Sequence, residues 1–418
     1  MRLRLYHLTW MAVLVAMLDY RFFAKAPGVP SITLLQLVSL MLLFALGMQA
    51  ITKRRVRRVE ILVHEGRWVV MYFLWAGIAA LWGILHSNYQ SAAYLEDLLP
   101  SLVLFVLVIL SVHSRSDLYG LLTAYKIGMS IELLIGASQV LSGEPRFVPL
   151  NEGSQWKTDL LGTIVAAPER LPTGLFTHPN GYALFLIPFA FMLITGIIYQ
   201  PRLNAGRRLV NMGLLLLMGL VLWRAYSKGA YAWILLGMVL VMLPSALPRF
   251  RLSLGWLILL GGIIGLTVFS LQEGIGTMLS RYGLWQAAFA VFKNPLVLML
   301  GNGNDAMLIQ STQFSNMYYP SSHNTFLDQV IVFGLPALLI YGVIAINAIR
   351  DSARISTSLR PEERGIGIFL NAGLVALLGS FFFEPALFGT MLQAQFFLLA
   401  AFTIVLHRVT HRAVGKMA

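Results

Sequence analysis

The sequence predicts an all-α, polytopic integral membrane protein, with about twelve transmembrane helices in a single membrane domain that covers residues 1–418. Apolar residues make up 58% of the chain and charged residues only 12%, whereas a soluble domain carries about 25% charged residues. The mean hydropathy is +0.74. Apolar stretches of about 20 residues recur along the chain, and this length suits a helix that crosses a hydrocarbon core of about 30 Å.

The predicted spans follow one another with short connections, apart from one long loop. They lie at 6–22, 30–51, 67–86, 96–113, 118–141, 179–199, 208–223, 230–247, 253–271, 324–349, 365–384 and 389–407. Segments of ten residues with alternating polarity, which are typical of membrane β-barrels, are absent. Neither an internal repeat nor a soluble domain is visible. The sequence therefore predicts a bundle of membrane helices and little else.

The distribution of Lys and Arg predicts the orientation of the chain, because cytoplasmic loops carry an excess of these residues. With both termini cytoplasmic, 21 of the 31 basic residues fall on the cytoplasmic side. The formal net charge of +13 is then mainly an orientation signal and does not require a nucleic-acid partner. The same reasoning places the long loop on the external side. The absence of cysteine excludes disulfides and thiolate metal sites.

The long loop, Gln272–Ser322, is where we expect the chemistry, and residues 272–323 are predicted to form part of the active site between the ninth and tenth spans. Within the loop, Arg281–Leu300 has apolar residues at positions 285, 289, 292 and 296. This spacing predicts an amphipathic helix that lies on the membrane surface and roofs the site. Gly301-Asn302-Gly303 is first of all a turn signal.

Several basic residues depart from the cytoplasmic bias and lie in external segments. Arg224 and Lys228 occupy a very short turn, Arg281 lies in the long loop, and Arg170 and His178 precede the sixth span. Basic side chains close to the membrane suit an anionic lipid headgroup or a polyprenyl pyrophosphate, since Arg binds two oxygens at once and Lys adds a point charge. The alternative is that these residues reach to the membrane surface or cap helix ends.

His323 stands at the entrance to the tenth span and is the candidate general base. An imidazole with an ordinary pKa near 6.5 accepts a proton from a hydroxyl at neutral pH; a histidine at a membrane interface also serves as a simple polar anchor. Asn324 and Asp328 follow, but Asp328 is five positions from His323, so a His–Asp dyad is not predicted. No acidic pair or histidine cluster with metal-ligand spacing is found, so neither a metal nor another cofactor is predicted.

Two further features lie within the predicted spans. Lys126 and Glu132 are costly in lipid and are expected to face the protein interior, where they either pair with other helices or mark an ion path. Gly261 and Gly265 form a GxxxG pattern within the ninth span, which is most simply a site of close helix packing.

The motifs together resemble those of the O-antigen ligase and O-antigen polymerase superfamily. The resemblance covers about residues 170–340 in motif and the whole chain in topology. It rests on Phe176-Thr177-His178-Pro179-Asn180-Gly181, Ser227-Lys228-Gly229, Arg281 with Trp285 and Pro295, Gly301-Asn302-Gly303, and His323-Asn324 followed by nine residues and Gly334. The chain departs from the family pattern at Ala337, where Gly, Thr or Tyr is usual, and at Lys228, where many relatives have Arg.

The resemblance implies an inverting, metal-independent glycosyltransferase of the GT-C-like type in the bacterial inner membrane. The donor would be a glycan on undecaprenyl pyrophosphate, and the acceptor would be a sugar hydroxyl of lipid A–core at the periplasmic face, among membrane lipids. His323 would act as the base, while Arg281, with Arg224 or Lys228, would hold the pyrophosphate. Arg170, His178, Asn180 and Asn324 would complete the substrate-binding residues.

Alternative functions remain open at this point. An O-antigen or exopolysaccharide polymerase and a protein O-glycosyltransferase belong to the same superfamily and differ in the acceptor. The His-Asn-(nine residues)-Gly pattern and the lack of a large C-terminal external domain favour the ligase. A polyprenyl-lipid flippase or transporter is the alternative outside this class, and it would require inverted repeats and coupling charges near the middle of the membrane.

Overall fold

The structure, a computed structural model, describes most of the chain as helices. It describes residues 5–18, 21–22, 32–33, 62, 64–86, 90–143, 157–158, 164–166, 171–176, 178–200, 204–242, 248–272, 276–301, 321–358, 360–384 and 390–414. The helices are α1 (Leu5–Ala16), α4 (Arg67–Leu85), α5 (Gln90–Ser111), α6 (Arg115–Ser142), α7 (Pro179–Tyr199), α8 (Ala205–Ala225), α9 (Lys228–Met242), α10 (Pro248–Gln272), α11 (Gly276–Val291), α12 (Pro295–Leu300), α14 (Thr325–Phe333), α15 (Leu335–Ile355), α16 (Pro361–Phe381) and α17 (Thr390–Val414).

The only strands among these residues are very short. β1 (Arg21–Phe22) pairs antiparallel with β2 (Ile32–Thr33), and β3 (Lys157–Thr158) pairs antiparallel with β4 (Ile164–Ala166). In the described part of the chain, eight helices are long and apolar enough to cross a membrane, namely α4, α5, α6, α7, α8, α15, α16 and α17. The prediction of a polytopic helical membrane protein is therefore confirmed. The second predicted span, 30–51, lies outside the described residues.

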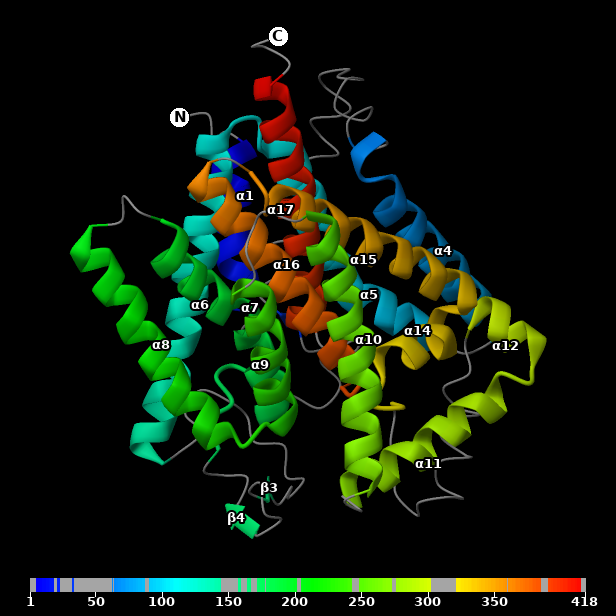
Figure 1. The fold of residues 1–418 in the computed structure, drawn as a ribbon. Coiled ribbons are helices and arrows are strands. Elements are labelled where there is room, and N and C mark those ends of the chain that lie inside the picture. Colours follow the sequence, from blue (N-terminus) through cyan, green and yellow to red (C-terminus); the bar gives the residue numbers. More distant parts are fainter. Residues whose placement is uncertain are drawn as a thin grey trace.

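Helices α16 and α17 form the centre of the bundle. The apolar stretch of α16 is 94% buried within the protein and that of α17 is 89% buried, whereas that of α8 is only 22% buried. Because lipid is as apolar as a protein core, an edge helix of a membrane bundle can stay apolar on its outer face, so burial within the protein identifies the central helices. Figure 1 shows the same arrangement, with α16 and α17 in the middle and α8 at the left margin.

The two ends of the bundle differ in character. In Figure 1 the start of α1 and the end of α17 lie at the upper end, and the α8–α9 turn and the start of α11 lie at the lower end. The upper end carries the ion pairs of Arg115 with Glu363 and of Arg408 with Glu65, each with an N–O distance of 2.8 Å. The candidate site residues described below lie at the other end.

Two predicted continuous helices are interrupted in the structure. The span predicted at 324–349 divides into α14 and α15 at Gly334, whose φ of 83° lies in the left-handed region that glycine adopts readily. The helix predicted over Arg281–Leu300 divides into α11 and α12 because the Asn294 side chain caps α12, whose first residue is Pro295. The stretch predicted as a loop is thus partly helical, with α11 beginning at Gly276.

The glycine at the α14–α15 break is required by close backbone packing. A Cβ atom at Gly334 would lie 2.1 Å from the carbonyl oxygen of Met299, and one at Gly301 would lie 2.2 Å from that of Val332. Such distances are far inside van der Waals contact. The end of α12 therefore rests directly against the break between α14 and α15.

We expect the substitution Gly334→Ala to lower the free energy of unfolding by about 2 kcal/mol or more, because it adds both left-handed strain and steric overlap. Thermal unfolding of the purified protein in detergent measures the effect. Gly342→Ala in α15 is the matched control, since a Cβ atom there meets nothing within 4 Å. Equal unfolding temperatures for the two variants would show that the backbone contact is not needed.

Candidate active site

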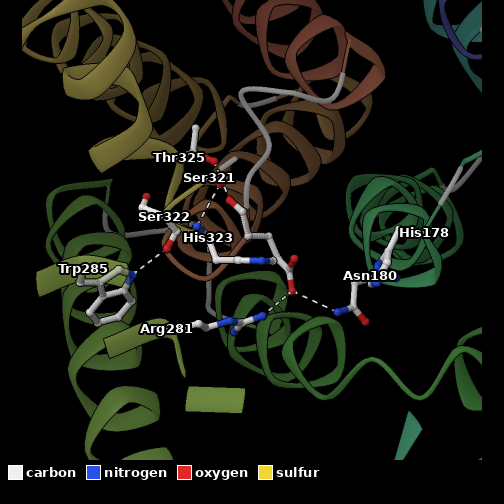
Figure 2. Close-up of polar contacts among 9 residues, drawn as sticks. His178, Asn180, Arg281, Trp285, Ser321, Ser322, His323 and Thr325 are labelled. Carbon is white, nitrogen blue, oxygen red and sulfur yellow. Dashed lines mark hydrogen bonds and ion pairs between the residues drawn. The ribbon is translucent and has the colours of Figure 1, made fainter. Parts of the chain in front are cut away.

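Four segments that are distant in the sequence meet at the lower end of the bundle, around the carboxylate of Glu384. Arg281 of α11 forms an ion pair with this group, with an Nη2–Oε1 distance of 3.0 Å. Asn180, at the start of α7, donates from Nδ2 to the same Oε1 atom at 3.2 Å. The hydroxyl of Thr325, at the start of α14, donates to the main-chain oxygen of Glu384 at 2.7 Å. Figure 2 shows Arg281 and Asn180 directed toward one shared acceptor.

The loop that carries His323 is fixed by Asp328, which is buried in α14. One carboxylate oxygen of Asp328 accepts from the backbone N–H of Ser322 at 2.8 Å and from its hydroxyl at 2.7 Å, and the other accepts from Ser321 Oγ at 2.8 Å. Ser321 Oγ in turn accepts the backbone N–H of His323 at 3.0 Å. The carboxylate therefore reaches back to the loop before the histidine, and its contacts are with the two serines.

The backbone at His323 is held in an unusual conformation. Its φ is 53°, one of two positive values among the described residues other than glycine. Trp285 of α11 supports the same loop by donating from Nε1 to the main-chain oxygen of Ser322 at 3.1 Å (Figure 2). A left-handed backbone outside glycine costs about 1 kcal/mol or more and persists only where the surroundings over-determine it. At His323 the conformation is held by the hydrogen bonds of Asp328, Ser321 and Ser322 and by that of Trp285 in α11.

The electrostatic environment favours the neutral form of His323. Burial lowers the pKa of the imidazole from its ordinary 6.5; the Glu384 carboxylate works in the opposite direction and the Arg281 guanidinium lowers it further. The net direction is downward, so the ring is uncharged at neutral pH. A neutral imidazole beside a carboxylate can accept a proton and then be stabilised as the cation.

The ion pair between Arg281 and Glu384 is largely shielded from solvent, since only 20% of the arginine side chain and 17% of the glutamate side chain are exposed. The part of the guanidinium that stays exposed can bind a second anion with two suitably placed oxygens. The site thus combines a guanidinium that can bind an anion, that of Arg281, with a nearby proton acceptor, the imidazole of His323.

Two of the predicted substrate-binding residues cap helices. Asn324 is buried, and its side-chain oxygen accepts from the backbone N–H groups of Phe326 at 3.0 Å and Leu327 at 3.1 Å at the start of α14. His178 caps α7, because its Nδ1 atom accepts from the backbone N–H of Asn180 at 3.1 Å. These caps orient the helices that deliver Thr325 and Asn180 to the cluster. Contact of either residue with substrate stays a prediction.

The remaining predicted residues are not brought into the cluster. Arg224 lies in the last turn of α8 and Lys228 begins α9, on either side of a turn in which Tyr226 has a φ of 50° and Ser227 is buried. In the part of the chain that the structure describes, neither cation forms an ion pair. They lie at the same end of the bundle as α11 (Figure 1). Arg170 lies outside the described residues.

Glu384 is the residue that sequence reasoning missed. It follows Phe381-Phe382-Phe383 at the C-terminal end of the predicted span 365–384 and precedes Pro385. A carboxylate placed directly at the end of an apolar span is a signal that could have been used, because such a group is expensive to hold near lipid without a partner.

The charged residues within α6 have structural partners. Lys126 donates to the side-chain oxygen of Asn211 in α8. Glu132 accepts from the backbone N–H of Leu175 at 2.7 Å, and Gln139 accepts from those of Thr173 and Gly174 at 2.8 and 2.9 Å. Helix α6 thus anchors the segment that leads into α7 and Asn180. These contacts favour the structural interpretation of Lys126 and Glu132 over an ion path.

These observations define an α-helical, polytopic membrane protein with a polar cluster at one end of its bundle. No known family profile matches the chain, and no curated protein is found to be similar to it. Across the described ranges, no three His, Asp or Glu side chains group in the way that metal ligands would.

Proposed function

We propose that the protein is a glycosyltransferase of the O-antigen ligase type, with about twelve transmembrane helices in the bacterial inner membrane. It would transfer a glycan from undecaprenyl pyrophosphate to a sugar hydroxyl of lipid A–core at the periplasmic face. The observation that carries this proposal is the convergence of Arg281, His323 and Asn180 around Glu384, at the end of the bundle opposite to the start of α1. Three of the residues singled out in the sequence thus share one environment.

The proposed reaction uses one proton acceptor and a set of cations. Neutral His323 takes the proton of the acceptor hydroxyl as its oxygen attacks the anomeric carbon of the donor. The bond from that carbon to the phosphate oxygen breaks, and its electron pair leaves with the pyrophosphate. Arg281, with Arg224 or Lys228, stabilises the charge on the leaving group. Because pyrophosphate is already a good leaving group, positioning and electrostatic stabilisation suffice without a metal ion.

The competing functions differ in what they require of these residues. A polymerase and a protein O-glycosyltransferase would use the same donor site with another acceptor. A flippase or transporter would need charges near the middle of the membrane that are available for coupling. The contacts of Lys126 with Asn211 and of Glu132 with Leu175 support the enzyme over the transporter.

Reconstitution tests the proposal directly. The purified protein in liposomes is given undecaprenyl-pyrophosphate-linked glycan and lipid A–core in the presence of a metal chelator. We expect glycosylated lipid A–core as the product. Parallel reactions with only the lipid-linked glycan, or with a protein acceptor, distinguish the polymerase and the protein glycosyltransferase. Movement of the lipid across the bilayer without any transfer would overturn the proposal in favour of a flippase.

The pH dependence of transfer should report the lowered pKa of His323. The base must be neutral, so the decline of kcat/KM at acid pH, where the imidazole becomes protonated, should be centred below 6.5, the ordinary histidine value. A pH profile of kcat/KM for the acceptor, measured at subsaturating acceptor, reports the free enzyme and measures this. A decline centred at or above pH 6.5 would contradict the buried, neutral state of the ring.

A further inference from the structure

An apolar groove of about 520 Å³ lies between α9 and α10, outside the polar cluster. Its walls include Ala232, Leu235 and Leu236 of α9, and its α10 side carries three glycines, Gly261, Gly262 and Gly265. The volume falls within the range of about 300–1,000 Å³ that is usual for ligand pockets. Leu235 is 69% exposed, so the groove opens to the surroundings of the bundle.

The three glycines of α10 do not play the same part. A Cβ atom at Gly262 would lie 2.8 Å from Leu236 and 3.1 Å from Trp233, so this glycine allows the two helices to approach. Cβ atoms at Gly261 and Gly265 would meet nothing within 4 Å. The GxxxG pair predicted to pack against a helix therefore faces open space in the described structure. Because glycine has no side chain, Gly261 and Gly265 leave the groove unfilled.

The groove starts close to the basic turn. Lys228 is the first residue of α9, and Ala232 and Leu236 follow it by four and eight residues, which is about 6 and 12 Å along a helix. On the other side, α10 runs from Gly265 to Gln272 over about 10 Å and leads to α11, which carries Arg281. Both walls of the groove thus lead toward cationic residues at the same end of the bundle (Figure 1).

We propose that this groove holds the isoprenoid chain of a polyprenyl pyrophosphate, with the pyrophosphate against Lys228 and Arg224. The inference rests on the proposed function for its choice of donor. An apolar groove whose α9 wall begins about one helical turn from Lys228 is complementary to a lipid with an anionic head.

The free energy of this contact comes from packing and from charge. The hydrocarbon of the bilayer is as apolar as the groove, so the hydrophobic effect contributes little, and close van der Waals contact decides the affinity of the chain. The headgroup adds the electrostatic part through Lys228 and Arg224. Filling the groove should therefore weaken binding of the long-chain lipid and leave binding of the bare headgroup unchanged.

The experiment fills the groove without disturbing the protein around it. Gly261→Leu and Gly265→Leu place side chains into open space, and leucine favours a helix more than glycine does. Gly213→Leu and Gly219→Leu in α8 are the matched controls, because a Cβ atom at either of these exposed glycines also meets nothing within 4 Å. Binding of undecaprenyl pyrophosphate is measured by native mass spectrometry, without acceptor, beside binding of inorganic pyrophosphate.

We expect both groove variants to bind undecaprenyl pyrophosphate at least about fivefold more weakly, a change of roughly 1 kcal/mol. Both controls should bind it normally, and all four variants should bind inorganic pyrophosphate as the native chain does. Equal weakening in the controls, or equally strong competition by phosphatidylglycerol, would overturn the proposal in favour of a general lipid contact. A change of oligomeric state in Gly261→Leu would assign the groove to a second copy of the chain.

Binding and transfer separate the two proposals. If the native protein transfers glycan and the groove variants bind the donor normally, the groove assignment fails and the proposed function stands. If the groove variants lose the long-chain lipid and the native protein transfers no glycan to any acceptor, the groove stands and the proposed function fails.

Discussion

His323→Ala is expected to lower kcat for glycan transfer by about 10²–10⁴, the contribution that a positioned general base makes. The donor should still bind, because the cations proposed to hold the pyrophosphate are unchanged. The loop should also keep its shape, since its contacts to Asp328 come from Ser321 and Ser322 and do not involve the imidazole. Transfer assays with separate determination of donor affinity measure both quantities.

A second histidine provides the control for this substitution. His86 is exposed at the C-terminal end of α4, where its Nδ1 atom lies 2.8 Å from the main-chain oxygen of Trp82. His86→Ala should leave transfer unchanged. Native transfer rates in His323→Ala, with an unfolding temperature equal to that of the native protein, would remove the proposed base. His323→Asn is a useful companion variant, because asparagine tolerates the positive φ of 53° at this position.

The sequence was informative about the membrane helices because hydropathy is a local property. The span predicted at 179–199 coincides with α7, and that at 67–86 nearly coincides with α4. The break at Gly334 was missed because glycine is common in transmembrane helices and leaves the hydropathy of a span almost unchanged. What makes this glycine a break is the carbonyl of Met299 packed against it, and a contact of that kind is not visible in the sequence.

The candidate site was predicted in part, for a similar reason. Arg281 stood out because it departs from the predicted cytoplasmic bias of basic residues, and His323 because it stands at the entrance to a predicted span. Glu384 lies 103 residues from Arg281 and 204 from Asn180, so only the folded bundle brings the three together. Asp328 was not predicted to pair with His323, because two residues five positions apart on a helix lie on different faces. In the structure His323 precedes α14, and the Asp328 carboxylate accepts hydrogen bonds from Ser321 and Ser322 instead.

Glu384→Gln is expected to lower both KM for the donor and kcat. The amide keeps an oxygen that can accept from Asn180 but has no charge, so Arg281 loses its ion pair and becomes a better partner for pyrophosphate. At the same time the Glu384 carboxylate, which raises the pKa of His323, is lost, so the imidazole becomes a weaker base and its cation is less stabilised. We expect KM to fall a few-fold and kcat to fall about 10-fold or more.

The opposite effects on affinity and turnover make this variant diagnostic, because a residue that only supports the fold would not lower KM. The acid limb of the pH–rate profile should also move to lower pH, as the remaining influences on His323 both lower its pKa. Glu362→Gln, in the first turn of α16 at the opposite end of the bundle, should change neither parameter. A raised KM with unchanged kcat would instead mean that Glu384 holds Arg281 in place for the headgroup. The carboxylate would then be a positioning residue for the arginine, without influence on the base.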